Sequence, residues 1–198
     1  ISEEYVHSQC AVPSFKFYQG FAASLCISVN DVVVHGIPNN NILKEGDIVS
    51  IDCGACKNGY HGDYAYTFAV GQISEEKRLL LERTKESLLL GIAEAKVGNT
   101  TGDIGAAVQT YAESFGYGVV RELCGHGIGK NMHEMPDVPN YGVRGRGTRL
   151  VQGMVICIEP MITMGKRNIT MDQDGWTIRT RDGLSAAHFE HQVALTAN

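Results

Sequence analysis

The apolar residues of this chain recur with two different periods. Short runs rich in β-branched residues lie at Leu25 to Val34 and at Gly46 to Asp52, which is typical of strands. From Ser74 to Ala95 and from Thr100 to Phe115 they recur every three or four positions, as on one face of a helix. This order predicts an α+β protein with an antiparallel sheet covered by helices on one face. Further strands are predicted at 117–123, 154–162, 176–180 and 189–195.

The helical period also predicts which side chains face the core. In the first helix, capped by Ser74, these are Leu80, Thr84, Leu88, Ile92 and Ala95. In the second helix, capped by Thr100 or Thr101, these are Ile104, Val108, Tyr111 and Phe115.

Asn58-Gly59 predicts a hairpin, because this dipeptide is typical of a two-residue turn. With that turn, Gly54 lies opposite Asp63, and Asp52 shares the face of Asp63 about 7–8 Å away on the diagonal. Two acids so placed can converge on one cation or on a close pair of cations. From the hairpin alone, the alternative that both acids point into water stays open.

A weak internal repeat adds further acids to this picture. Segments 46–52 and 153–159 each begin with glycine, continue with matched apolar positions and end in a carboxylate, Asp52 or Glu159. Glu190 follows in the last predicted strand, and His126 lies between glycines in the segment Cys124-Gly125-His126-Gly127-Ile128-Gly129. Buried carboxylates need partners. Four carboxylates and one imidazole favour a hydrolytic site with two divalent cations.

Composition and charge narrow the classes of partner and location that the sequence allows. The chain has 198 residues and a formal net charge of -5, which argues against a specific nucleic-acid partner. No apolar run is long enough to cross a bilayer. The six cysteines are expected to be reduced thiols in a cytoplasmic protein. Arg144-Gly145-Arg146-Gly147 is expected to be a solvated loop, with contact to RNA or to the ribosome surface as the alternative.

Other candidate motifs are weaker. The glycine-rich segment 125–130 does not match a phosphate-binding loop, because Asn131 follows Lys130. Cys53 and Cys56 point to opposite faces of a strand and have no second cysteine pair at zinc spacing. His61 is expected to support the site beside Asp63. Ordinary surface or core roles are expected for His7, His188 and His191.

Taken together, several segments resemble the type I methionine aminopeptidases over nearly the whole chain. The short separation of Glu159 and Glu190 fits type I, because type II enzymes carry a long insertion there. The resemblance implies the pita-bread fold and one catalytic domain, 1–198, with two related halves at about 1–110 and 111–198. It also implies that the family's N-terminal helical segment is missing here. The segments are Val34-His35-Gly36-Ile37-Pro38, Asp47 to Asp52, Tyr60-His61-Gly62-Asp63, Cys124 to Gly129, His133-Glu134-Met135-Pro136, Ile158-Glu159-Pro160-Met161 and Phe189-Glu190-His191.

The resemblance further implies an activity and a role for each site residue. The chain is expected to be a monomer that removes the initiator methionine from nascent polypeptides with a small second residue, by attack of a metal-bound hydroxide. Two divalent ions, Mn, Fe, Co or Zn, are expected. The implied metal ligands are Asp52, Asp63, His126, Glu159 and Glu190. The implied catalytic residues are His35, His133 and Glu159, the last as the base. The implied methionine pocket consists of Tyr18, Phe21, Cys26, Met132 and Trp176.

Two other functions remain open at this point. Related pita-bread enzymes cleave X-Pro peptides, although they usually carry a separate N-terminal domain for which this chain is too short. A pita-bread protein that binds a partner without catalysis is the other alternative. The presence of all five ligand types argues against it.

Overall fold

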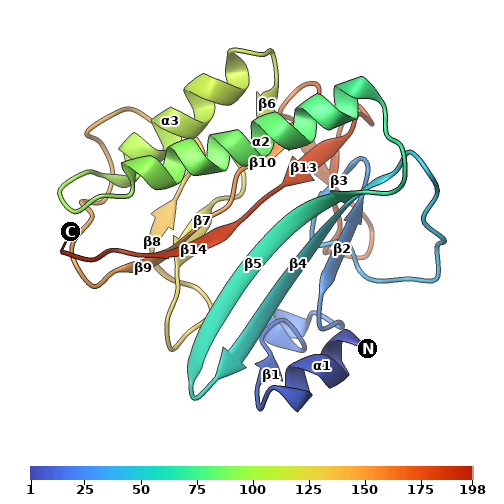
Figure 1. Ribbon diagram of the computed structural model, residues 1–198, viewed down its shortest axis with the longest axis horizontal. Coiled ribbons are helices and arrows are strands. Elements are labelled where there is room, and N and C mark those ends of the chain that lie inside the picture. The colour runs from blue at the N-terminus through green and yellow to red at the C-terminus, as the bar shows by residue number, and fades with distance from the viewer. Residues whose placement is uncertain (198) are drawn as a thin grey trace.

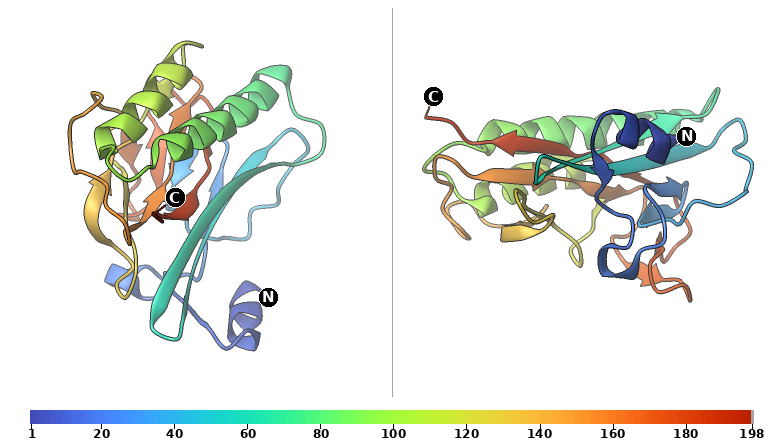
Figure 2. Two further views of the ribbon diagram at one scale, coloured as in Figure 1. Left: turned by 60° about the vertical axis from the view of Figure 1, so that its left-hand side comes forward. Right: turned by 90° about the horizontal axis from the view of Figure 1, so that it is seen from below.

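The computed structural model describes residues 1–197, so that Asn198, the end of the predicted domain, lies outside the described residues. Helices α2 (Glu75–Glu94) and α3 (Thr101–Glu113) lie side by side and cover one face of the strands (Figures 1 and 2). The paired strands are antiparallel, which confirms the predicted α+β class. The division into two related halves stays a prediction.

The strands form four small sheets within the described residues. The first contains β1 (Val12–Pro13), β2 (Cys26–Val29), β4 (Ile48–Lys57) and β5 (Tyr60–Ala69). The second contains β6 (Gly118–Val119), β10 (Met161–Thr163) and β13 (Ala186–His188). The third contains β3 (Val32–Val34), β11 (Ile169–Met171) and β12 (Ile178–Thr180). The fourth contains β7 (Gly125–Gly127), β8 (Glu134–Val138), β9 (Val155–Ile158) and β14 (His191–Ala194).

The hairpin β4–β5 has the predicted register, with Gly54 opposite Asp63. The other edge of β4 pairs with β2, where Cys26 lies opposite Asp52, and farther along with β1. Because β1 and β2 both pair with β4, the segment that connects them begins and ends beside β4. Within it, the Phe15 ring packs so closely on Gly54 that a Cβ there would lie 2.5 Å from a ring carbon. A side chain at position 54 would therefore have to displace the Phe15 ring.

Both helix starts are as predicted. The Ser74 hydroxyl accepts a hydrogen bond from the Lys77 amide, and Thr100 and Asp103 form a reciprocal capping box. The predicted inner faces are buried against the sheets at Leu80, Thr84, Leu88, Ile104 and Val108. Ile156, Ile158 and Ile162 complete this core from the strands.

The prediction that Phe115 faces the core is wrong. This residue lies beyond the end of α3, and 42% of its surface is exposed. Its ring instead packs edge-on against Tyr111, and the guanidinium of Arg83 lies 3.9 Å from the ring centre. The helical period continued to Phe115 in the sequence, but the helix itself ends at Glu113.

Two predicted strands are shorter or interrupted. The run 154–162 divides into β9 and β10 at Glu159-Pro160, because proline has no amide hydrogen for a strand ladder. The run 117–123 forms only β6. The short helix α1 (Ser2–Ser8) precedes β1. Within residues 1–197, the helices are too short or too polar to span a membrane.

Candidate active site

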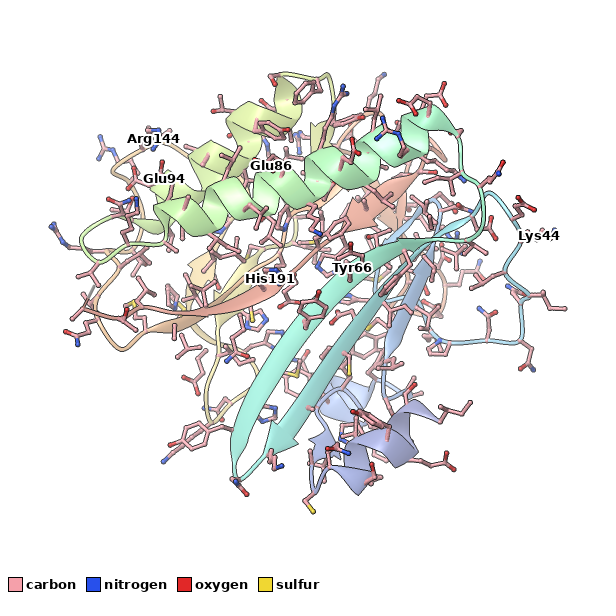
Figure 3. The ribbon with its side chains drawn as sticks, in the orientation of Figure 1. Lys44, Tyr66, Glu86, Glu94, Arg144 and His191 are labelled. Carbon is pink, nitrogen blue, oxygen red and sulfur yellow. The ribbon has the colours of Figure 1, made fainter. Side chains whose placement is uncertain are left out.

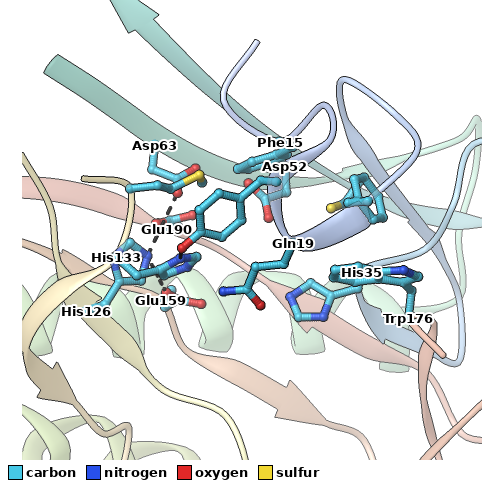
Figure 4. Close-up of a pocket in the computed structure, with 14 residues that line it drawn as sticks. Phe15, Gln19, His35, Asp52, Asp63, His126, His133, Glu159, Trp176 and Glu190 are labelled. Carbon is cyan, nitrogen blue, oxygen red and sulfur yellow. Dashed lines mark hydrogen bonds and ion pairs between the residues drawn. The ribbon is translucent and has the colours of Figure 1, made fainter. Parts of the chain in front are cut away.

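The hairpin places two acids at the centre of the molecule. Asp52 on β4 and Asp63 on β5 lie on the same face of the sheet, as their register requires. Both line a cavity of about 160 Å³, together with His126, Glu159 and Glu190 (Figure 4). The structure thus brings together all five predicted metal-ligand residues.

Close backbone packing positions His126. It lies on β7, between Gly125 and Gly127, where a Cβ would come within 2.3 Å of a neighbouring carbonyl oxygen on either side. These glycines allow β7 to fit between β8 and β9. Nδ1 of His126 lies 2.8 Å from the Gly127 carbonyl oxygen. Because a carbonyl only accepts, Nδ1 donates, and the neutral ring keeps an unprotonated Nε2 as a potential ligand.

That nitrogen faces the acids. Nε2 of His126 lies 3.6 Å from Oε1 of Glu159 and 3.9 Å from Oδ2 of Asp63. The ligand atoms of Asp63, His126, Cys157 and Glu190 lie within 4.8 Å of one another. Cys157 lies on β9, two residues before Glu159. The acids and the imidazole therefore surround one small volume.

Burial strongly affects the charges of this cluster. Desolvation, followed by repulsion from neighbouring carboxylates, raises the pKa of Asp52 and Glu190 well above the ordinary range. Desolvation, with the charge of Asp63, does the same for the pKa of Glu159. The pKa of Asp63 rises to about 7, mainly because of burial. Without a cation, burial therefore favours the protonated forms of these acids.

The arrangement of these side chains fits divalent cations. Within residues 1–197, buried side-chain atoms without a hydrogen-bond partner include Oδ1 of Asp52 and Oε1 of Glu190. Leaving a buried polar atom unpaired costs about 1–3 kcal/mol, which a bound cation would offset. Carboxylate oxygens with one imidazole nitrogen are a donor set that first-row divalent ions accept. The cluster is therefore a candidate metal centre.

The predicted pocket residues form the apolar side of the same cavity. Phe21, Cys26 and Met132 are buried together, and Tyr18 and Trp176 pack against them. The Phe21 and Trp176 rings meet edge to face at 5.1 Å between centres. Sequence reasoning missed two further lining residues, Phe15 and Gln19. Phe15 could have been suspected as an apolar neighbour of Tyr18, but nothing in the sequence marked Gln19.

His35 and His133 lie at opposite sides of the cavity (Figure 4). His35 follows β3 with φ of 58°, and burial, with His188 nearby, lowers its pKa to about 4. His133 lies at the mouth, where its ring centre is 4.2 Å from that of His126. Partial burial and the neighbouring histidines lower the pKa of His133 to about 4. Both rings are therefore neutral near pH 7.

His188, expected to be an ordinary surface or core histidine, is a core residue that lies directly beside the site. It is fully buried, lines a second cavity of about 130 Å³ beside the site, and places Nε2 3.6 Å from Oε2 of Glu159. Thr67 holds its backbone, since Thr67 Oγ1 both accepts from the His188 amide and donates to its carbonyl, and the Ser50 hydroxyl lies 2.8 Å from the same Thr67 oxygen. Its position two residues before Glu190, on the same face of the chain, was the available signal.

The other singled-out residues lie outside the cavity. His61 bonds through Nδ1 to Ser14 at 2.8 Å, and His191 stacks on Tyr64. Arg144 pairs with Glu94 at the end of α2, on the surface (Figure 3). The six cysteines, including Cys53 and Cys56, are free thiols.

Comparisons with known proteins agree with this site. The model of metallopeptidase family M24 matches residues 3–197. A methionine aminopeptidase of Clostridium acetobutylicum is 53% identical over 100% of this chain and 80% of its own length. Methionine aminopeptidase 1 of Bacillus subtilis is 51% identical over 99% of this chain and 79% of its own length.

Solved structures agree with the sequence relatives. Methionine aminopeptidase from Rickettsia prowazekii aligns with a TM-score of 0.97 and 41% identity, over 99% of this chain and 79% of that chain. A prolidase from Pyrococcus furiosus aligns less closely, with a TM-score of 0.71 and 29% identity over 88% of this chain and 46% of that chain. The pita-bread fold implied by the sequence is confirmed. This chain belongs to metallopeptidase family M24.

Proposed function

We propose that this chain is a metal-dependent aminopeptidase that removes the initiator methionine from nascent proteins with a small second residue. The proposal depends mainly on one observation, that a candidate metal centre and an apolar pocket share one cavity. A cluster of acids with His126 lies against an apolar pocket that includes Phe21 and Trp176. A site with these two parts can bind a cation and an apolar side chain at the same time. The relatives named above support this substrate class.

Asp52, Asp63, His126, Glu159 and Glu190 would hold the metal, which we propose to be two divalent ions among Mn, Fe, Co and Zn. When bound, such ions polarise a carbonyl oxygen and lower the pKa of water. Their positive charge also favours the ionised forms of the acids, reversing the effect of burial. The carboxylates then serve as ligands rather than as neutral acids.

Glu159 is the proposed general base. Its carboxylate lies between His126 and His188, so that it faces the cavity and both histidines. A buried carboxylate at this place takes a proton from water and passes it to the leaving amine of the second residue. Its position at the break between β9 and β10 directs the side chain out of the ladder.

The two cavity histidines act on the substrate itself. His133 at the mouth donates a hydrogen bond to the carbonyl oxygen of the first peptide bond, and His35 contacts the scissile amide nitrogen. Both rings are neutral near pH 7, so each has one donor and one acceptor nitrogen. The apolar wall holds the methionine side chain, and contacts between its thioether and the rings add to burial.

The proposal includes the setting of the reaction. We propose a cytoplasmic monomer whose partners are the N-termini of new polypeptides. The surface loop Arg144 to Gly147 is the part we assign to any contact with the ribosome. A specific nucleic-acid partner and a membrane are not part of the proposal.

The test is release of the first residue from peptides by the purified chain with added Mn²⁺ or Co²⁺. We expect release of methionine from Met-Ala-Ser and little or no cleavage of Lys-Ala-Ser, because the pocket offers no partner for an ammonium group. His126→Ala serves as the control that should lose activity. Comparable cleavage of both peptides would refute the pocket assignment, with Met132 the first residue to re-examine. Cleavage of X-Pro peptides in place of Met-Ala-Ser would instead favour the prolidase-like activity.

A further inference from the structure

The loop that forms one wall of the pocket is tightly wound. Phe17 and Gln19, on either side of Tyr18, have positive φ angles of 66° and 48°, which are uncommon for residues with a side chain. Backbone hydrogen bonds close the loop, from the Phe17 amide to the Phe21 carbonyl at 2.7 Å and from the Tyr18 amide to the Phe15 carbonyl at 3.0 Å. Such strain is found where the surroundings fix a conformation for function. Here the closed loop presents Tyr18 to the cavity.

The hydroxyl of Tyr18 reaches a residue far away in the sequence. It lies 2.8 Å from Nδ1 of His133, and the two ring centres are 5.2 Å apart. This is the hydrogen bond that the structure of residues 1–197 records for the His133 side chain. His133 is exposed at the cavity mouth, so surrounding atoms do not enclose it as they enclose His188. Its orientation therefore depends strongly on this contact.

The bond also selects a proton position. A neutral imidazole carries its hydrogen on one nitrogen and accepts at the other. If the phenol donates to Nδ1, the hydrogen is on Nε2, which is then free to donate to a substrate oxygen. The reverse arrangement would leave Nε2 as an acceptor and unable to perform that step.

We propose that Tyr18 is a positioning residue, whose hydroxyl donates to Nδ1 of His133 and keeps the Nε2–H directed at the substrate carbonyl. This inference rests on the proposed function for its consequence in catalysis, but not for the hydrogen bond itself. It gives Tyr18 a role beyond forming part of the apolar wall. It also links that wall to the group that contacts the peptide bond.

The first test uses the metal-free protein and needs no activity. In ¹⁵N-labelled protein, long-range proton–nitrogen spectra distinguish the two tautomers of each histidine, and the His133 signals are assigned by their loss in His133→Ala. We expect His133 in the wild type to be protonated at Nε2, and Tyr18→Phe to shift its ring nitrogens and mix the tautomers. Tyr5→Phe, which removes an exposed hydroxyl, should leave them unchanged. A wild-type Nδ1–H, or unchanged signals in Tyr18→Phe, would overturn the proposal.

The second test measures coupling between the two residues. Phenylalanine keeps the ring that packs in the pocket, so we expect Tyr18→Phe to keep its melting temperature and its KM for Met-Ala-Ser. We expect kcat to fall about 5–10-fold, the usual effect of one lost hydrogen bond. In a His133→Ala background, Tyr18→Phe should cause no further fall. An equal fall in both backgrounds would show that the hydroxyl acts elsewhere.

The two tests separate this proposal from the proposed function. If the wild type fails to release methionine, the function is refuted, while the tautomer spectra still decide the role of Tyr18. If Tyr18→Phe does not fold, the tautomer of the wild-type His133 decides alone.

Discussion

Burial acts on the acids and on the histidines of the site in opposite directions, because it penalises whichever form is charged. The pKa of Glu159 is raised well above its ordinary range, whereas the pKa of His35 and of fully buried His188 is lowered to about 4. Near pH 7 the cavity therefore contains neutral rings beside acids whose protonated forms are favoured by burial unless a cation is present. Burial thus raises the pKa of the carboxyl groups and lowers the pKa of the imidazoles.

His35 is expected to act on the substrate alone, since the five proposed metal ligands do not include it. We predict that His35→Ala keeps two metal ions and lowers kcat by about 10²-fold or more, as expected for loss of a positioned hydrogen bond. Because φ is positive at this position, His35→Asn is the better-tolerated companion variant. Metal content, melting temperature and kcat should be measured on the same sample.

A contrasting variant completes this experiment. His126→Ala should lose metal affinity and activity together. Loss of metal from both His35 variants, or an unchanged kcat, would show that His35 does not have the role proposed. A fall in melting temperature with a normal rate per folded molecule would indicate that His35 only satisfies a buried backbone group.

Of the individual residues that line the cavity, the sequence predicted most but not all. The turn at Asn58-Gly59 determines the pairing of β4 and β5, so the shared face of Asp52 and Asp63 followed from local rules. The position of His188 depends on β13 pairing with β10, which local periodicity does not report. Gln19 reaches the cavity through a strained loop, a conformation that composition does not predict.

Among the elements, α3 shows how glycines determine packing. The loop 139–147 lies directly on this helix at Gly102 and Gly105. A Cβ at Gly105 would lie 2.3 Å from the Tyr141 carbonyl oxygen and 2.6 Å from that of Pro139. These neighbours are backbone atoms, which cannot rotate away as the end of a side chain can.

We therefore predict that Gly105→Ala destabilises the protein. Alanine in a helix is favoured over glycine by about 1 kcal/mol, but overpacking of this kind costs about 1–3 kcal/mol. The midpoint of urea unfolding should fall, while the exposed Thr110→Ala on the same helix should leave it unchanged or slightly higher. Higher stability of Gly105→Ala would contradict the close contact with the loop.

Long helices and the hairpin could be predicted because their signals are local and repeat over many residues. Strands β7, β8 and β11 could not, because they are short and exist through pairing with distant segments. The glycines of β7 let neighbouring backbones approach closely, which no strand periodicity reports. The helical period of α3 likewise could not show that Phe115 lies past the helix end.

For the molecule as a whole, stability without metal should depend on pH through the buried acids. Asp63 has a folded pKa of about 7, raised from 3.8 by burial, so the folded state keeps a proton that the unfolded chain has already lost. The stabilisation from this proton is complete below about pH 4 and is lost as the pH rises towards 7. At pH 8 the metal-free protein carries the full penalty of an ionised buried acid.

We predict that Asp63→Asn raises the Tm of the metal-free protein at pH 8, and that the difference from the wild type narrows at pH 5. Each kcal/mol of relief should raise Tm by about 2–4 °C in a chain of this size. Histidine protonation acts equally in both proteins and cancels in the difference. The measurement is calorimetry after EDTA treatment, with metal removal confirmed by elemental analysis.

With added Mn²⁺ or Co²⁺, the wild type should have a higher Tm than Asp63→Asn. Binding to the folded state raises the Tm of the wild type by mass action, whereas Asp63→Asn should lose most of this gain. If EDTA leaves the wild-type Tm unchanged after verified metal removal, the proposed link between cations and stability is wrong.

The attachment of the pocket wall to β4 also limits how this protein can be redesigned for other substrates. Any side chain at Gly54 would push against Phe15 or displace the strand that carries Asp52. An attempt to widen the pocket from that side would therefore also alter cation binding. Trp176 lies just before β12, which contributes none of the five proposed ligands. Engineering of a broader substrate range should begin there.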